Sequence, residues 1–149
     1  MIVQEVSIMV DHVSIEKRSQ IMAAVHNKGN YSTEKKLSEL LVKNGILGWV
    51  QNANNIIGKP DFVFEKEKLI IFADGCFWHG CKKHKSLPRS NLEFWRHKIC
   101  NNVSRDNRIR RKLRRHGWHV LQIWEHDIKN NEEKVVRKIN RKIKIIVST

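Results

Sequence analysis

Residues 58–74 read GKPDFVFEKEKLIIFAD and contain two short apolar segments separated by charged residues. In residues 61–65 two phenylalanines alternate with a valine, which is the pattern of a strand. Residues 69–73 form a continuous apolar run, as expected for a strand that is buried on both faces. The polar turn between the two segments predicts a hairpin at the centre of a sheet.

The hairpin carries two carboxylates at positions that suit a metal ion. Asp61 stands at the start of the first strand and Asp74 at the end of the second. Since these two ends lie side by side in a hairpin, we predict that Asp61 and Asp74 face one Mg²⁺, which prefers hard oxygen ligands. A purely structural reading is also open, because Pro-Asp sequences favour turns.

The remaining segments predict helices around a small sheet. Apolar residues recur every four positions at Trp95, Ile99 and Val103, and Asn91 stands where a helix cap is expected. We expect helices over residues 16–27, 33–44, 91–116 and 132–146, and further strands over residues 49–52 and 118–124. This order of elements predicts a mixed α/β domain.

Composition narrows the classes of protein to consider. The chain has 149 residues, 29 Lys and Arg against 15 Asp and Glu, and a net charge of +14, which points to a polyanionic partner. No apolar run approaches the roughly 18 residues of a membrane span. The three cysteines favour a reducing compartment over a disulfide framework. A membrane protein, a secreted disulfide scaffold and a repeat array are therefore not expected.

A segment rich in Cys and His, residues 76–84 (CFWHGCKKH), predicts a zinc site. Zn²⁺ takes four Cys or His ligands in a tetrahedron, and the expected ligands are Cys76, Cys81, His84 and His126. The spacing leaves His79 as a rival to His84. The alternative is a pair of reduced thiols beside surface histidines.

Aromatic residues embedded in basic sequence indicate a nucleic-acid surface. Phe77, Trp78 and Trp95 could stack on bases or wedge between them while Arg and Lys hold phosphates. We expect Phe94 in the core. Because Phe77 and Trp78 are adjacent in a loop, we expect that both do not fit into the same core. The basic run over residues 105–115 is either a solvated helix face or a stripe that contacts phosphates.

Over residues 11–128 these motifs together resemble the very short patch repair (Vsr) DNA mismatch endonucleases. The segment from Asp74 to Cys81 is the most specific. The resemblance is carried by KRSQIM (17–22), Glu34, GKPD (58–61), FADGCFWHGC (72–81), NLEFW (91–95), NVSRD (102–106) and GWHV (117–120) through WEH (124–126).

The resemblance implies a restriction-endonuclease-like fold of the PD-(D/E)XK type, with a small mixed sheet flanked by helices and a structural zinc site. It implies an enzyme that needs Mg²⁺ to nick one DNA strand 5′ of the thymine in a T·G mismatch, the product of 5-methylcytosine deamination. By position, Asp61 resembles the metal-binding aspartate, with Asp74 beside it. His79 resembles the catalytic histidine and Glu34 an acidic residue near the site.

The resemblance also assigns the DNA contacts. Phe77, Trp78 and Trp95 resemble the aromatic wedge beside the mismatch, and Lys59, Arg96 and Arg105 are the expected phosphate contacts. One departure concerns chemistry. Related nucleases often carry a lysine two residues past the second acid, where this chain has Cys76, so His79 must act as the base.

The sequence is interpreted as one domain over residues 1–149, with an N-terminal extension (1–10) and a basic C-terminal helix (130–149). We expect a monomer in the bacterial cytoplasm that binds mismatched double-stranded DNA and no membrane. Mismatch-repair proteins and a cytosine-5 methyltransferase are the candidate protein partners. Two alternatives stay open: a Vsr-like endonuclease of restriction or mobile elements, and a zinc-stabilised DNA-binding protein that does not cut.

Overall fold

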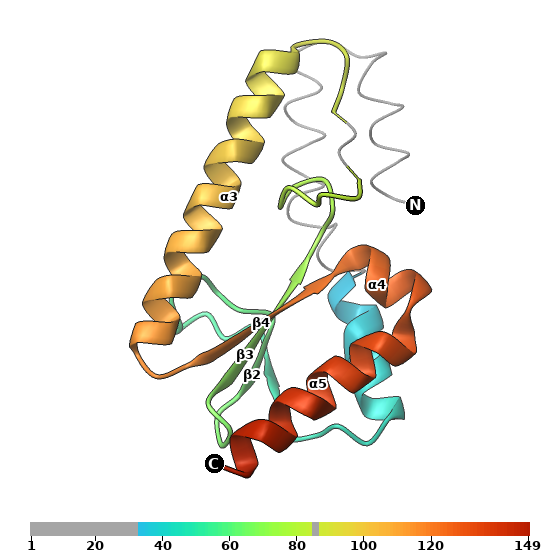
Figure 1. The fold of residues 1–149 in the computed structure, drawn as a ribbon, viewed down its shortest axis with the longest axis vertical. Helices are drawn as coiled ribbons and strands as arrows, with labels where there is room; N and C mark the ends of the chain where they lie inside the picture. The colour runs from blue at the N-terminus through green and yellow to red at the C-terminus, as the bar shows by residue number, and fades with distance from the viewer. Residues whose placement is uncertain (1–32, 85–86) are drawn as a thin grey trace.

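The computed structural model describes residues 33–84 and 87–149, which form a four-stranded sheet with helices on both sides (Figure 1). The predicted helix over residues 16–27, the N-terminal extension and the KRSQIM motif lie outside the described residues. The strands are β1 (Val50–Gln51), β2 (Phe62–Phe64), β3 (Leu69–Asp74) and β4 (His119–Trp124). The four strands predicted in this part of the sequence are therefore confirmed.

The sheet is mixed and has the order β1-β2-β3-β4. β2 and β3 form the predicted hairpin, with Phe62 opposite Ile71 in antiparallel pairing. β4 pairs with β3 in parallel, and Asp74 lies opposite Trp124 at the end of both strands. A parallel neighbour needs a crossover connection, and α3 (Leu92–Arg115) provides it.

The helices begin and end close to the predicted positions. The second predicted helix covers residues 33–43 in the described part of the chain, and α5 (Glu132–Val147) is the basic C-terminal helix. The expected cap of α3 is wrong: Asn91 adopts a left-handed conformation with φ of 60°, and its side chain makes no capping hydrogen bond. Among the described helices, none is long and apolar enough to cross a bilayer.

The short helix α4 (Glu125–Asn130) was not predicted. It follows β4 without a loop, and its six residues span fewer than two turns, too few to show helical periodicity. It carries His126, one of the predicted metal ligands.

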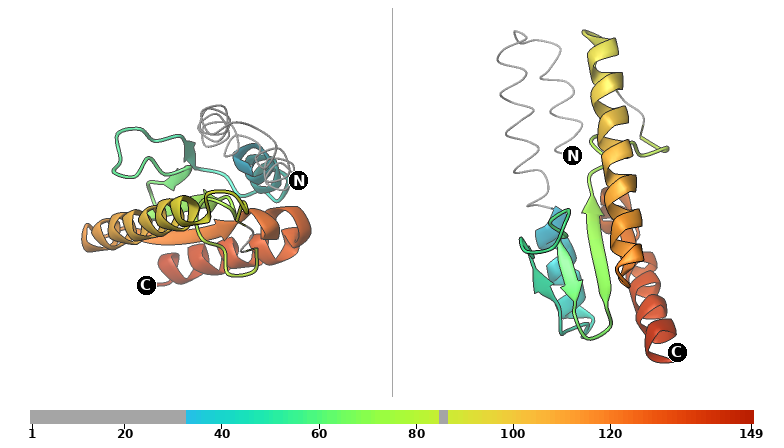
Figure 2. Two further views of the ribbon diagram at one scale, coloured as in Figure 1. Left: turned by 90° about the horizontal axis from the view of Figure 1, so that it is seen from above. Right: turned by 90° about the vertical axis from the view of Figure 1, so that its left-hand side faces the viewer.

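Helices cover both faces of the sheet (Figure 2), and buried apolar side chains lie on both of these faces. One face, with Phe62, Phe64 and Ile71, packs against the helix over residues 33–43 and against α4 and α5. The other face, with Val63 and Ile70, packs against the C-terminal half of α3. Alternate residues of β2 and β3 thus serve opposite layers, which explains why residues 62–64 and 69–73 are all apolar.

Candidate active site and metal cluster

A cleft of about 540 Å³ lies where the start of β2, the end of β3 and the middle of α3 meet. It brings together six residues that were predicted as site residues from the sequence. These are Glu34, Lys59, Asp61, Asp74, His79 and Arg105. Asp61 and His79, from segments 18 positions apart, therefore face the same space.

The carboxylates of Glu34, Asp61 and Asp74 lie close together in the cleft. The backbone N–H of Ala73 donates a hydrogen bond of 2.7 Å to Oδ2 of Asp61. Burial raises the pKa of Asp61 well above its usual value, and the hydrogen bond and charge of Glu34 and the charge of Asp74 raise it further. Carboxylates this close are stable only when they share a proton or a cation, so this part of the cleft suits a bound metal ion.

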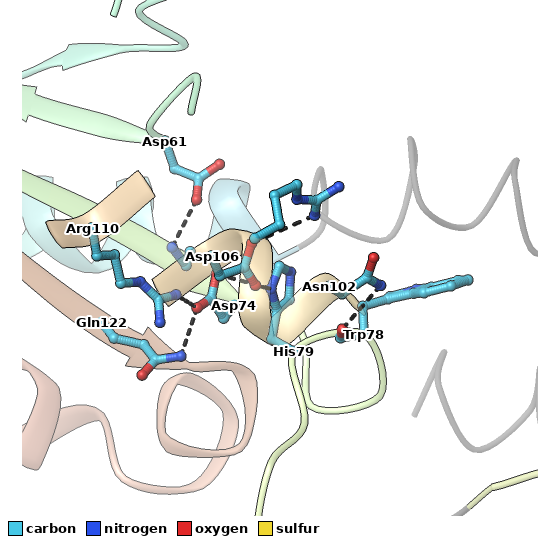
Figure 3. A network of polar contacts seen from close by, with 10 residues as sticks. Asp61, Asp74, Trp78, His79, Asn102, Asp106, Arg110 and Gln122 are labelled. Atoms are coloured by element: carbon cyan, nitrogen blue, oxygen red, sulfur yellow. Dashed lines mark hydrogen bonds and ion pairs between the residues drawn. The ribbon is translucent and has the colours of Figure 1, made fainter. Parts of the chain in front are cut away.

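The Asp74 carboxylate is fixed by two side chains (Figure 3). Its Oδ2 atom forms an ion pair with the guanidinium of Arg110 and accepts a 2.6 Å hydrogen bond from Nε2 of Gln122. Its Oδ1 atom lies 3.7 Å from Nδ1 of His79. One oxygen is thus fully engaged, and the other faces His79.

His79 is paired with a carboxylate that was given no role in the sequence analysis. Its Nδ1 atom lies 2.6 Å from Oδ2 of Asp106 on α3. Burial alone would lower the pKa of His79, but the Asp106 hydrogen bond and the charges of Asp74 and Asp106 raise it above the usual value. With Nδ1–H donating to Asp106, Nε2 is the nitrogen that can accept a proton.

Three polar residues on one face of α3 hold the loop that carries His79 (Figure 3). Asn102, Asp106 and Arg110 follow one another at intervals of four, so they share a helix face. Asn102 donates to the carbonyl oxygen of Trp78 at 3.3 Å, while the other two bind His79 and Asp74. The four-residue spacing of polar groups beside the apolar stripe is the signal that could have identified Asp106 and Arg110. Gln122 has no comparable signal.

Two glycines allow α3 to lie close to the cleft loops. A Cβ atom on Gly80, whose φ is +69°, would lie 2.7 Å from Cγ2 of Val103. A Cβ atom on Gly58 would lie 2.4 Å from Cγ2 of Ile109. Side chains at these positions would push α3 away from His79 and Lys59.

The Cys and His residues form a second site next to the cleft. Ligand atoms of Cys76, Cys81, His84 and His126 all lie within 4.8 Å of one another. The Sγ atom of Cys76 is 3.2 Å from Nδ1 of His126, and Sγ of Cys81 is 3.5 Å from Nδ1 of both His84 and His126. A tetrahedron with bonds of about 2.3 Å to sulfur and 2.0–2.1 Å to nitrogen gives S···N separations of about 3.5 Å.

This geometry resolves the rivalry between the two histidines. His84 joins the cluster, whereas His79 pairs with Asp106 in the cleft. Burial raises the pKa of the Cys76 thiol to about 12, so a thiolate at this place needs a cation beside it. The cluster can hold a metal ion.

The aromatic residues give two corrections. Trp95 is buried, but so are both Phe77 and Trp78, at 5% and 4% exposure, so the expectation that they could not share a core is wrong. The rings of Phe77 and Trp78 meet edge to face at 5.0 Å, and both contact Trp95. Phe94 is 46% exposed rather than in the core, because one residue along a helix turns the side chain by about 100°.

The predicted phosphate contacts lie in different places. Lys59 and Arg105 line the cleft, and Nη2 of Arg105 is 3.5 Å from Oδ1 of Asp106. Arg96 does not line the cleft and instead pairs with Glu93 at 3.3 Å on the exposed surface of α3. Nearby, Nζ of Lys98 lies 5.7 Å from the centre of a Trp78 ring.

Comparison with known proteins gives a consistent result. The family model described as "DNA mismatch endonuclease Vsr" matches residues 10–85. The DNA mismatch endonuclease Vsr of Escherichia coli K12 is 39% identical over 118 residues, covering 78% of this chain and 74% of that protein. The type II nicking enzyme V.NmeDIP of Neisseria meningitidis serogroup C is 34% identical over 137 residues, covering 91% of each. The type II nicking enzyme V.HpaIIP of Haemophilus parainfluenzae is 33% identical over 136 residues, covering 90% of this chain and 96% of that enzyme.

These matches agree with the architecture. A small mixed sheet covered by helices, with acidic residues at the ends of neighbouring strands, fits an α/β nuclease fold. On this evidence of sequence and fold, the chain belongs to the Vsr family of DNA mismatch endonucleases.

Proposed function

We propose that this protein nicks one strand of duplex DNA on the 5′ side of the thymine in a T·G mismatch. The observation that carries the proposal is the convergence of Asp61, Asp74 and Glu34 with the His79–Asp106 pair in one cleft. Binding alone would need no such arrangement, so it argues for hydrolysis of a phosphodiester.

The carboxylates would hold Mg²⁺. The Oδ2 atoms of Asp61 and Asp74 accept hydrogen bonds from the protein, and the two Oδ1 atoms are the proposed ligands. Glu34 adds negative charge next to Asp61. When bound, Mg²⁺ makes water more acidic and offsets the charge that develops on the phosphate.

His79 would act as the general base. Asp106 holds its Nδ1 atom and thereby leaves Nε2 to take a proton from the attacking water. The turn that carries His79 is fixed by a 3.3 Å hydrogen bond from its backbone N–H to the carbonyl of Gly75. The base is therefore held by both its backbone and its ring.

The substrate would be held by charge and recognised by deformation. Lys59 and Arg105 are suited to phosphates beside the cleft, and Arg96 to phosphates further along α3. The net charge of +14 strengthens binding to any duplex. Charge alone does not distinguish a mismatch from a matched pair.

We assign mismatch recognition to the aromatic cluster of Phe77 and Trp78, which precede His79 directly in sequence, and Trp95 on α3. The three rings are buried against one another, so insertion into DNA would require the cluster to open. Inserting aromatic rings between base pairs requires unstacking, and a T·G pair costs less to open than a matched pair. The cluster would thus link detection of the mismatch to His79, the proposed general base.

The metal of the Cys and His cluster is proposed to be Zn²⁺, because two thiolates and two imidazoles in a tetrahedral arrangement are typical zinc ligands. The cluster ties the loop after β3 to His126 in α4. Its role would be to hold residues 76–84 in place, including His79.

The proposed substrate implies other proteins. T·G pairs arise when 5-methylcytosine deaminates, so a cytosine-5 methyltransferase would create the sites and repair proteins would process the nick. These partners are proposals from chemistry and family resemblance.

The test uses 5′-labelled duplexes of one sequence with a T·G, A·C or matched pair, incubated with protein and Mg²⁺. We expect one cut, 5′ of the mismatched thymine, and no cut in the partner strand. Cleavage of matched duplexes at a fixed sequence would favour a restriction enzyme. Tight binding of all duplexes without any cut would favour the DNA-binding alternative and contradict the proposal.

A further inference from the structure

The Asp74 carboxylate receives hydrogen bonds from two elements that are far apart in sequence. Arg110 approaches from α3 and Gln122 from β4, and both bind the same oxygen, Oδ2 (Figure 3). The side chains of Arg110 and Asp74 are only 12% and 4% exposed. This oxygen is therefore saturated by donors that belong to the protein.

Both donors are themselves held firmly. The Arg110 guanidinium carbon lies 5.5 Å from the centre of the Phe72 ring. Gln122 pairs with Phe72 across the parallel β3–β4 ladder, so it stands on the same face of the sheet as Asp74. Each donor thus reaches Asp74 from a rigid element beside Phe72.

The arginine that pairs with Asp74 lies far from it in the sequence. Two residues past Asp74 the chain has Cys76, which belongs to the Cys and His cluster. In the described residues, the ion-pair partners of Asp74 are His79, five positions further along the chain, and Arg110 on α3. Arg110 supplies a cation at this carboxylate from more than thirty positions away.

We propose that Arg110 and Gln122 are positioning residues that fix Asp74 by its Oδ2 atom, so that Oδ1 stays turned toward His79 and the cleft. Arg110 balances the charge of the carboxylate, and Gln122 sets its orientation. The inference rests on the proposed function, because it assigns how a ligand of the catalytic metal is held. If Arg110 instead held the DNA backbone, its removal would weaken DNA binding rather than lower kcat.

Gln122→Met is the cleaner variant, because it removes a donor without altering charge or size greatly. We expect the kcat for nicking to fall about tenfold, the worth of one hydrogen bond to a charged group. KM for the duplex should stay within about twofold, since no DNA contact is lost.

Arg110→Met should reduce kcat about 100-fold, as a displaced reacting group does. Arg110→Lys should recover a large part of that loss, because it restores the cation beside Asp74. Arg111→Met is the matched control, since Arg111 is an exposed neighbour on α3 whose Nε donates to the carbonyl of Asn107. It measures the effect of losing one positive charge from the helix.

A second readout does not depend on cleavage. Ca²⁺ binds carboxylate oxygens, so the wild-type protein should bind a mismatched duplex more tightly with Ca²⁺ than without divalent cations. Gln122→Met and Arg110→Met should lose that gain but keep the affinity measured without cations. Melting temperatures show whether each variant is folded, and if Arg110→Met does not fold, Gln122→Met decides.

Two results would overturn the inference. Gln122→Met with wild-type kcat and an intact Ca²⁺ response would show that Asp74 needs no such support. Arg110→Met that weakens cation-free binding more than Arg111→Met does, with kcat unchanged, would make Arg110 a phosphate contact. A wild-type protein that does not nick would instead contradict the proposed function, while the Ca²⁺ response would still test the positioning of Asp74.

Discussion

The Cys and His cluster and the carboxylate cleft lie on either side of the same loop, yet they are built differently. The cluster takes three ligands from residues 76–84 and one from α4. The cleft takes its acids from separate strands and from helix 33–43, and its supporting side chains from α3 and β4. Most ligands of the cluster thus come from one short segment, whereas the cleft depends throughout on contacts between distant elements.

The two sites also differ in how they are stabilised. In the cluster, one cation bound by four ligands would itself stabilise the fold. In the cleft, the stripe of Asn102, Asp106 and Arg110 on α3 secures three successive parts of the loop and strand. We therefore expect loss of the cluster to lower mainly the melting temperature, and changes in the cleft to lower mainly the rate of nicking.

The largest effect is expected for Asp61→Ala. Loss of the principal metal ligand should reduce nicking at least about 1000-fold, since a bound metal supplies several kcal/mol to the transition state. Duplex affinity without divalent cations should stay within about threefold of the wild-type value. Glu65→Ala, which removes an exposed carboxylate from the same hairpin, is the control. Nicking by Asp61→Ala at the wild-type rate would mean that the cleft is not the active site.

Cys81→Ser tests the cluster. The wild-type protein should contain one zinc per chain and the variant none, as measured by elemental analysis. The melting temperature should fall by about 10 °C, because several kcal/mol are lost at about 2–4 °C per kcal/mol. Cys100→Ser, at an exposed cysteine outside the cluster, should change neither value. A zinc-free wild-type protein that melts at the same temperature as Cys81→Ser would contradict the site.

Asp106→Asn tests the polar stripe of α3. The neutral form of His79 is the base, so nicking increases as pH rises through the pKa of His79. Asp106 raises that pKa, and its removal should therefore move the acidic limb of the rate profile to lower pH. The plateau should also fall about 100-fold, since the ring loses its orienting partner. An acidic limb that stays in place would remove His79 from the proposed role.

The smallest effect is expected for the aromatic cluster. Trp78→Leu should reduce the preference for a T·G duplex over a matched duplex about tenfold, because stacking of one base on an aromatic ring is worth 1–3 kcal/mol. Phe94→Leu is the control, at an exposed aromatic residue of the same region. The ratio of nicking rates on the two duplexes measures the effect. If Trp78→Leu keeps the wild-type ratio and melts at a lower temperature, Trp78 serves the core alone.

The same contrast explains what could be predicted from the sequence. The hairpin and the positions of Asp61 and Asp74 followed from alternation and from a buried apolar run, which are local signals. Residue type and spacing pointed to Cys76, Cys81, His84 and His126 but left His79 as a rival to His84, and the folded geometry decided between the two histidines. Residue type did not reveal Asp106, Arg110 or Gln122, because charged and amide residues on a helix or strand are usually solvated. Their roles depend on how α3 and β4 pack beside β3.

The aromatic residues illustrate the same limit. Because Phe77 and Trp78 are adjacent in a loop, we expected that they could not share a core. In the tight turn that expectation does not hold, and the two rings meet edge to face.

The most direct measurement is anomalous diffraction from crystals of the protein grown with Mn²⁺, recorded at the zinc and manganese absorption edges. The account predicts a zinc peak surrounded by Cys76, Cys81, His84 and His126. It also predicts a separate manganese peak in the cleft, within ligand distance of Asp61 and of Oδ1 of Asp74. A manganese peak elsewhere, with none at Asp61, would contradict the account.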